Sequence, residues 1–337
     1  EIGDQDDKRQ RFDNLEGIKG DKTFDQLEQF QNIGAFIQQE WIFNKSFRAT
    51  FGIRSDINKL KATDRYLNDG DGTGKQTLNN VNPLIGFVYS IRKNINLYGN
   101  YSTHFETPTL NELSNNPDPS SSGGFNPGLN PQYAKNVELG LKGFFNENLF
   151  IEMAAFNIDA LDEIIPFELP NIPGRTFYRN AGTSFRKGFE FGLNSRLSKG
   201  LQMSMAYTYS DFSYGAYQTK SGVFDGNSLP VIPKMLLYGE LSYFHIFGIY
   251  GMIQLQYIGD IYADDANTVK DNAYQLMHMR FGYKKYYSNL MIEPFIGLNN
   301  LFNTSYNSNI RMNAWGGRYF EPGSGFNIYG GVRIRFE

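Results

Sequence analysis

Apolar and polar side chains alternate along Phe326-Asn327-Ile328-Tyr329-Gly330-Gly331-Val332-Arg333-Ile334-Arg335-Phe336, the last stretch of the chain. One parity holds Phe326, Ile328, Val332, Ile334 and Phe336, and the other holds Asn327, Arg333 and Arg335. Successive residues of a β-strand face opposite sides of it. This stretch therefore predicts a strand with one oily face and one wet face, which is the pattern that lipid on one side requires.

The same alternation recurs upstream, most clearly in residues 136–142, 186–194 and 201–210, where the charged side chains stay on the polar face. Weaker alternation covers residues 34–43, 46–54, 83–92, 94–104, 149–158, 234–245, 249–258, 273–283 and 289–299, with a short stretch at 175–180. We therefore predict an all-β protein with about fourteen strands in this chain.

Short and long connections alternate strictly between these strands. The short ones are turns centred on Asn44-Lys45, Arg92-Lys93, Asn146-Glu147, Ser198-Lys199-Gly200, Phe247-Gly248 and residues 285–289. The long ones cover residues 55–81, 105–134, 159–182, 211–233, 259–272 and 300–325. Outer-membrane barrels have short periplasmic turns and long extracellular loops. We therefore predict a transmembrane antiparallel β-barrel that crosses the bacterial outer membrane many times.

This orientation places residues 1–31 outside the cell, as the tail of a further extracellular loop, and makes residues 32–337 the transmembrane β-barrel portion. The strand at residues 34–43 then needs a partner on its free side. Backbone groups left unpaired within lipid cost several kcal/mol each. Either these strands close on themselves, or further strands complete the wall.

The composition excludes several classes of protein. No stretch approaches the roughly 18 apolar residues that a membrane-spanning helix needs. The formal net charge is −3 and no long basic run is present, so we expect no nucleic-acid partner. The chain has no Cys and three widely separated His residues, which argues against a metal site built on their side chains. An aromatic content of 16% suits the aromatic girdles of a membrane barrel.

Several ordered motifs resemble those of TonB-dependent outer-membrane receptors. They are Phe105–Leu113, Asn126–Pro131, Asn136–Lys142, Phe177–Gly182 followed by Lys187–Glu190, Gly297–Phe302 followed by Tyr306, Gly317–Gly323, and the aromatic last strand. The resemblance covers essentially the whole chain as the C-terminal part of a roughly 22-stranded plugged barrel, with the plug domain and the first strands absent from this chain. Glu337 departs from the pattern, because chains of that family usually end on the aromatic residue.

The resemblance implies TonB-dependent active uptake of a scarce small molecule across the outer membrane. Its expected partners are the TonB–ExbB–ExbD complex, acting through the plug, outer-membrane lipid and lipopolysaccharide, and the ligand; we expect a monomer. Asp264–Thr268 after Tyr262, with residues 318–322, resembles the subgroup that handles pyrroloquinoline quinone. Ferric siderophore receptors are commoner members, so both cargoes are considered. No cofactor is expected to be bound by this portion itself.

Cationic and aromatic residues in the long loops are the candidate ligand contacts, because they provide stacking surfaces and charge-assisted hydrogen bonds for an anionic ligand. These candidates are Arg175, Tyr178, Arg179, Tyr262, Arg311, Trp315, Arg318 and Tyr319. Alternatively, these side chains form the outer girdle, pack the loops, or pair with loop carboxylates or lipopolysaccharide phosphates. A second set of charges should face the lumen and hold the plug or one another: Glu138, Lys142, Arg186, Glu190, Glu293 and Arg333.

Two other functions compete with active uptake. A passive porin shares the alternation and the loop lengths, and a plug domain in the upstream sequence would argue against it. An outer-membrane barrel hydrolase needs a nucleophile and a base, and Ser102 and His104 share one parity of a strand. No further member of a catalytic set is recognisable, so we expect no enzymatic activity.

Overall fold

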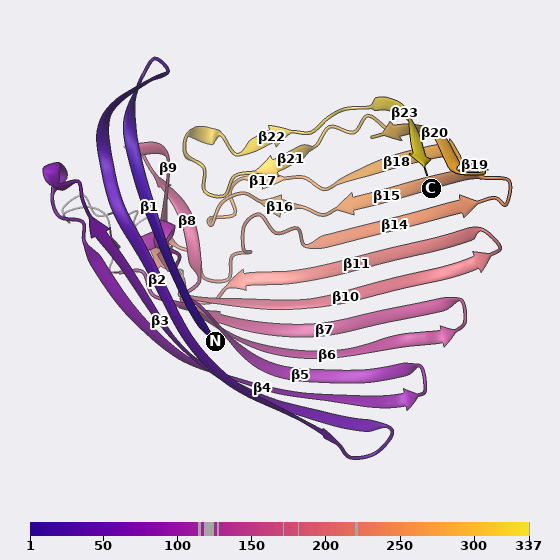
Figure 1. Cartoon of the computed structure of the whole chain (residues 1–337), viewed down its shortest axis with the longest axis horizontal. Coiled ribbons are helices and arrows are strands. Elements are labelled where there is room, and N and C mark those ends of the chain that lie inside the picture. The colour runs from indigo at the N-terminus through magenta and orange to yellow at the C-terminus, as the bar shows by residue number, and fades with distance from the viewer. Residues whose placement is uncertain are drawn as a thin grey trace.

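The computed structural model describes residues 1–336 except 114–115, 118–124, 127, 171, 181 and 220–221. Across the described part of the chain, one fifteen-stranded antiparallel sheet forms a curved wall (Figure 1). Its order follows the sequence: β1 (Ile2–Leu15), β2 (Ile18–Ile42), β3 (Phe47–Asp64), β4 (Gly74–Arg92), β5 (Ile95–Glu106), β6 (Gln132–Asn146), β7 (Leu149–Leu161), β10 (Thr183–Ser198), β11 (Leu201–Tyr214), β14 (Met235–Phe244), β15 (Ile249–Ile258), β18 (Tyr274–Tyr283), β20 (Leu290–Asn299) and β23 (Asn327–Phe336), with the short β19 (Lys285–Tyr287) beside β20. The predicted all-β antiparallel architecture is confirmed.

The two ends of this wall do not meet. Within the described residues, β23 pairs only with β20, and β1 pairs only with β2. The wall is therefore an open sheet here, with one unpaired edge on β1 and another on β23. Among the same residues, no helix is both long and apolar enough to span a membrane.

The predicted oily face is the convex outside of the wall. Along β4, Val81, Ile85, Phe87, Tyr89 and Ile91 are all exposed at one parity. Large apolar side chains that are exposed on neighbouring strands in this way would be an extended apolar patch in water. Facing lipid, they match the outer band of a membrane barrel.

The tight turns lie along one end of the wall, on the right-hand side of Figure 1. Two of them depend on glycine: Gly200 has φ +82° between β10 and β11, and Gly248 has φ +98° between β14 and β15. A Cβ atom at Gly200 would also run into the backbone carbonyl oxygen of Phe244 in β14, and one at Gly248 would run into that of Lys284, which follows β18. Glycine therefore permits the short connections from which the orientation is inferred.

The long-connection end differs from the prediction in two places. Residues 175–180 are not a strand of the wall: they belong to β9 (Ile172–Asn180), which pairs only with β8 (Ile164–Leu169) in a separate hairpin. The predicted loop at residues 55–81 is mostly strand, because β3 and β4 stay paired from Phe47↔Tyr89 to Ala62↔Gly74.

Residues 1–31 are ordered as strand rather than as an irregular tail. β1 and β2 form a hairpin whose register runs from Ile2↔Ile33 to Leu15↔Ile18, with a turn at Glu16-Gly17. A tilted strand crosses the hydrocarbon layer with about 9–11 residues, whereas β2 has 25. Counted from the tight turn after Ile42, β1 and the part of β2 that pairs with it therefore lie beyond the length of strand that a bilayer crossing needs.

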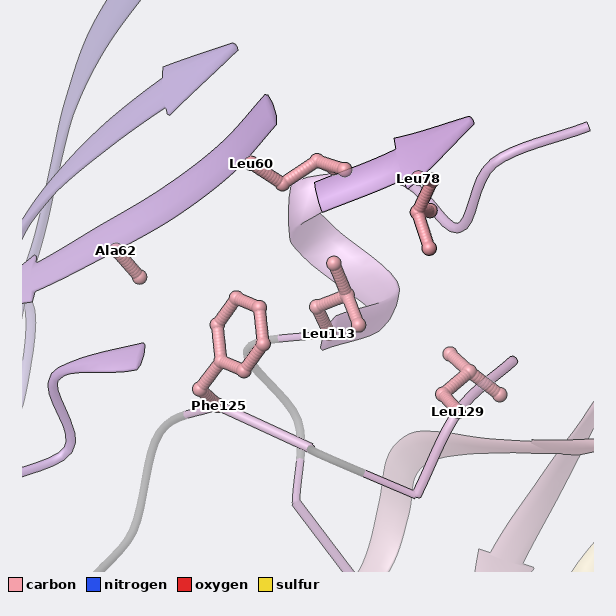
Figure 2. Close-up of a cluster of buried hydrophobic side chains, with 6 residues drawn as sticks. All are labelled: Leu60, Ala62, Leu78, Leu113, Phe125 and Leu129. Atoms are coloured by element: carbon pink, nitrogen blue, oxygen red, sulfur yellow. The ribbon is translucent and has the colours of Figure 1, made fainter. Parts of the chain in front are cut away.

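The short elements at the long-connection end pack into two small apolar clusters. The first joins Leu60, Ala62 and Leu78 to Leu113 of α1 (Leu110–Leu113), Phe125 and Leu129 (Figure 2). Helix α1 begins with a capping box, since the Glu112 carboxylate accepts from the Thr109 N–H at 2.8 Å and the Thr109 hydroxyl accepts from the Glu112 N–H at 3.3 Å.

The second cluster lies beneath the later loops. It joins Ile165 of β8 to Tyr214, Tyr217, Phe224 and Leu229. The remaining elements of this end are small hairpins: β12 (Gln218–Thr219) with β13 (Gly222–Val223), β16 (Ile261–Tyr262) with β17 (Lys270–Asp271), and β21 (Asn307–Ile310) with β22 (Phe320–Pro322), together with the short 3-10 helices η1 (Leu67–Asp69) and η2 (Trp315–Gly317).

Candidate ligand-binding loops and lumen wall

Asp265 is the centre of the loop assembly. Its side chain is 3% exposed and accepts hydrogen bonds from the Tyr214 hydroxyl at 2.7 Å, the Tyr217 hydroxyl at 3.0 Å and the Arg179 guanidinium at 3.1 Å. Its backbone N–H donates to Asn313 at 3.0 Å. A buried carboxylate needs such partners, so this "Asp265 node" fastens four of the long loops to one another.

The environment of the node raises the pKa of both tyrosines. Burial is the main cause at Tyr214, and the charge of Asp265 and its hydrogen bond add to it. At Tyr217 burial again comes first, followed by the charge of Asp265, while Arg179 acts in the opposite direction. Both hydroxyls therefore remain protonated donors at neutral pH.

Arg179 is held on three sides. Besides its ion pair with Asp265, its guanidinium carbon lies 4.7 Å from the ring centroid of Phe167 and 5.4 Å from that of Tyr217. These contacts use the faces of the guanidinium as well as one donor edge. The geometry favours the alternative role for this candidate, that of packing the loops.

Asp264, the neighbour of Asp265, has a local structural role. Its carboxylate accepts from the N–H groups of Thr268 at 2.9 Å and Val269 at 2.8 Å, and from the Thr268 hydroxyl at 2.5 Å. This is the side-chain capping of a tight turn that aspartate commonly provides. The Asp264–Thr268 motif is thereby accounted for by the turn between β16 and β17.

The last long loop holds four of the candidate ligand residues. Arg311 pairs with Glu321 at 2.7 Å across the β21–β22 hairpin, and this bond is the main cause of the lowered pKa of Glu321. Trp315, at 44% exposed, and Arg318 lie at the exposed tip. The Tyr319 ring is half-buried beside Phe320. Arg311, Trp315 and Arg318 are thus all exposed to solvent, but Arg311 is already held by its ion pair with Glu321.

The other loop candidates lie elsewhere. Tyr178 packs against the first apolar cluster, and burial raises its pKa. Arg175, also on β9, stacks over the Phe177 ring at 5.1 Å. Tyr262 is in β16, where its carbonyl accepts from the Val231 N–H at 2.7 Å. The structure thus groups Arg179 with the Asp265 node, and it places Arg175, Tyr178 and the Trp315–Arg318 tip separately.

On the wall, Glu293 of β20 lies beside Arg280 of β18 and Arg333 of β23, so charged side chains of three strands meet there. It is 3% exposed and accepts from the Tyr250 hydroxyl at 2.7 Å and from Arg333 at 3.2 Å, with Arg280 at 3.8 Å. Arg280 also lies over the Phe295 ring at 4.1 Å. The predicted wall residues Glu293 and Arg333 therefore hold one another.

The remaining wall residues form two groups. Arg186 pairs with the loop residue Glu163, which also accepts from Ser184. Lys142 lies over the Tyr98 ring at 5.4 Å. Glu138 and Glu190, together with Glu152, lie close enough to Tyr98 to act on it electrostatically. An acidic stretch of wall thus surrounds Tyr98, with Lys142 opposite Glu152 in the register.

Ser102 and His104 do meet, with the hydroxyl oxygen 3.1 Å from Nε2. Within the described residues, no carboxylate hydrogen-bonds the His104 ring to complete a triad, and no three His, Asp or Glu side chains gather as metal ligands. This pair is therefore a hydrogen bond within β5.

The sequence model of the family described as "TonB dependent receptor-like, beta-barrel" matches residues 3–301. The chain belongs to the TonB-dependent receptor family. The iron-regulated outer membrane virulence protein of Vibrio cholerae is 28% identical to this TonB-dependent receptor chain over 241 residues, covering 66% of this chain and 34% of that protein. The probable TonB-dependent siderophore receptor PiuA of Acinetobacter baumannii is 24% identical over 269 residues, covering 76% and 34%.

Solved structures of the same architecture resemble this TonB-dependent receptor chain. The siderophore receptor PiuA of Acinetobacter baumannii superposes with a TM-score of 0.72 at 19% identity, covering 94% of this chain and 44% of that one. The copper transporter OprC superposes with a TM-score of 0.77 at 16% identity, covering 99% and 53%. The chain spans about a third of the length of the curated relatives.

Two residues within the family motifs are structural in this receptor chain. The Asn180 side chain donates to the carbonyls of Asn130 and Asp162 at 3.0 and 2.7 Å. Asn300, 2% exposed, donates to those of Thr304 and Ser324 at 2.8 and 3.1 Å. Sequence reasoning missed Tyr214, Tyr217 and Asn313 as partners of the Asp265 node, because no local pattern marks them.

Proposed function

We propose that this chain forms part of the wall of a transporter that takes up a ferric siderophore, or another metal chelate, across the bacterial outer membrane. The observation that carries the proposal is the family match over residues 3–301, joined by an iron-regulated relative at 28% identity. Energy enters from the TonB–ExbB–ExbD complex through a plug domain. Further strands complete the wall at the unpaired edges of β1 and β23.

In this proposal the inner face of the wall holds the plug. The acidic residues near Tyr98, which include Glu138 and Glu190, suit basic groups on a plug surface. Glu293 and Arg333 already satisfy one another, so they contribute less to such an interface. Ligand capture belongs to the exposed Trp315 and Arg318 and to Arg175, while Arg179, Tyr178 and Arg311 shape the loops around them.

The test is TonB-dependent uptake by cells that carry the full-length receptor. Radioactive iron bound to a panel of siderophores should accumulate in energised cells and should fail to do so when TonB is deleted. Purified receptor is titrated with the same ferric complexes and, as the second cargo, with pyrroloquinoline quinone. Uptake that persists without TonB would indicate a passive channel. If the receptor binds neither the ferric complexes nor pyrroloquinoline quinone at micromolar concentration, both cargo assignments are rejected.

A further inference from the structure

The short turn between β14 and β15 differs in composition from other short turns of the wall. Its tip consists of Ile246 and Phe247, which are 90% and 71% exposed. Four of the other short turns have polar or charged residues at their tips: Asn44-Lys45, Arg92-Lys93, Asn146-Glu147 and Ser198-Lys199-Gly200. Large apolar side chains exposed at the tip of a turn are unfavourable in water. The β14–β15 turn therefore favours a partner that offers apolar contact.

This turn lies at the boundary of the bilayer. β14 and β15 have ten residues each, and a tilted strand crosses the hydrocarbon layer with about 9–11 residues. The turn that joins them therefore begins where the hydrocarbon ends, in the layer of the lipid headgroups. Figure 1 shows β19 at the same end of the wall. The Lys284 N–H, just before β19, donates to the Gly248 carbonyl at 2.8 Å, so the start of β19 lies beside the turn.

His245 is on the lipid-facing side of the wall at this boundary. Its backbone N–H donates to the Ile249 carbonyl at 2.8 Å, and cross-strand neighbours share a face. Ile249 is 57% exposed on the apolar outer face, opposite Tyr283. The His245 ring is flanked by those of Tyr243 and Phe247, at centroid distances of 6.0 and 4.8 Å. Its Nδ1 accepts from the Phe247 N–H at 3.3 Å, so Nε2 carries the proton and is a hydrogen-bond donor.

Lys285 is on the same outer face, two residues beyond Tyr283. It is opposite Ile292 of β20, and the next residue, Glu293, faces inside toward Tyr250. Successive residues of a strand face opposite sides, so Ile292 and its partner Lys285 face outward. The Lys285 side chain is exposed, and within the described residues no carboxylate pairs with it.

The strands around these two donors offer no carboxylate on the outer face. β14, β15, β18, β19, β20 and β23 contain two acidic residues, Glu240 and Glu293. Glu240 has the parity of Phe244, which is opposite Tyr250 in the register. The Tyr250 hydroxyl donates to Glu293 on the inner face, so both acidic residues face inside. An anionic group from outside the chain would therefore meet two donors and no competing charge.

We propose that His245, Lys285 and the β14–β15 turn bind an anionic phospholipid of the periplasmic leaflet. Lys285 and the Nε2–H of His245 bind the headgroup phosphate, and the acyl chains continue along the apolar outer face. Ile246 and Phe247 keep the turn within the headgroup layer, where aromatic side chains are favoured. The site rests on the proposed function for its membrane side, because short turns are periplasmic in outer-membrane barrels, and it is independent of the cargo.

The chemistry favours a lipid with a net negative charge. A lysine beside the membrane surface attracts an anionic headgroup, whereas the phosphate of phosphatidylcholine already has a cation attached to it. Inorganic phosphate has the charge but no acyl chains to contact the apolar turn. The two lipids and the free ion therefore separate the contribution of charge from that of apolar contact.

The experiment uses the full-length receptor purified in detergent. The probes are phosphatidylglycerol and phosphatidylcholine with identical acyl chains, and native mass spectrometry measures the Kd of each lipid. Wild type should bind phosphatidylglycerol more tightly. Lys285→Gln should weaken phosphatidylglycerol binding about tenfold, the size of one hydrogen bond to a charged group, and leave phosphatidylcholine binding unchanged. Phe247→Ser should weaken the binding of both lipids, because it removes apolar contact.

Lys93→Gln is the matched control, because it removes one exposed lysine from the polar β4–β5 turn at the same end of the wall. It should change neither Kd by more than about twofold. The inference is overturned if wild type binds the two lipids equally, if Lys285→Gln behaves like Lys93→Gln, or if millimolar inorganic phosphate displaces phosphatidylglycerol from wild type. TonB-dependent uptake is measured separately: its absence in wild type would reject the proposed function and leave the lipid site standing.

Discussion

The Asp265 node and the exposed Trp315–Arg318 tip both lie among the long loops and both contain an arginine, yet they are built in opposite ways. At the node, one buried carboxylate is matched by Arg179 and two tyrosine hydroxyls. At the tip, Trp315 and Arg318 are exposed to solvent. The difference teaches that a loop arginine is identified as a ligand contact by what already surrounds it, and that its position in a loop alone does not decide.

Removing the centre of the node should have the largest effect. Asp265→Ala leaves Arg179 and two buried hydroxyls without their acceptor. Breaking a buried pair from one side costs about 3–5 kcal/mol, and we expect about 3 because Arg179 is partly exposed. Hydrogen exchange of residues 222–233 and 260–271 should therefore speed up roughly a hundredfold.

Asp260→Ala serves as the control for that experiment. Asp260 pairs with Lys270 at 2.6 Å, but both side chains are substantially exposed, so its loss should cost less than about 1 kcal/mol. Equal exchange rates in the two variants would show that Asp265 does not hold the loops together.

Tyr214→Phe probes the same node more gently. It deletes the shortest bond to Asp265, at 2.7 Å, and keeps the buried ring. A hydrogen bond to a charged group contributes about 1.5–3 kcal/mol, so loop protection should fall by roughly tenfold or more. Tyr207→Phe is the comparison, because it removes a hydroxyl from the same strand at a position outside the hydrogen bonds that the Asp265 carboxylate accepts. Indistinguishable protection in the two variants would contradict a role for the hydroxyl.

Sequence patterns predicted the wall well because lipid imposes a simple rule on it. Where strands cross the bilayer, as in residues 83–92 and 201–210, one parity must be apolar, and the structure has strands there. Beyond the bilayer both faces of a strand can meet water, so neither parity has to be apolar. Residues 2–15 and 55–64 are polar at both parities, so their pairing in β1 and β3 left no alternation to read.

The candidate site was less predictable, because it depends on distant residues meeting. Arg179 and Asp265 are 86 positions apart, and nothing near either residue in the sequence indicates the other. The residue types were recognisable, since loop arginines and aromatics do cluster here. The roles of these residues could not be predicted, because they depend on spatial partners. Arg179 is paired with Asp265 and holds loops together, whereas Arg318 is exposed and can contact a ligand.

Arg318→Ala tests the exposed counterpart of Arg179. Arg318 lies at the solvent-exposed tip of the last long loop, so its removal should leave loop protection unchanged. If it contacts the ferric complex, affinity should fall about tenfold by dialysis. Arg179→Ala should instead loosen the loops first. Binding that survives both substitutions unchanged would refute the assignment of these loops as the ligand site.

The smallest expected effect is the pH response of the Arg311–Glu321 pair. The hydrogen bond from Arg311 is the main reason why the pKa of Glu321 lies below its ordinary value of about 4.5. The ion pair therefore stabilises the hairpin fully when the pH is above that ordinary value. It is lost as the pH falls through the lowered value. Hydrogen exchange of residues 307–322 should be slower in wild type than in Glu321→Gln at pH 7, and the two should converge in acid. A difference that persists after Glu321 is protonated would mean that packing of the β21–β22 hairpin, rather than the ion pair, holds the loop that presents Trp315 and Arg318.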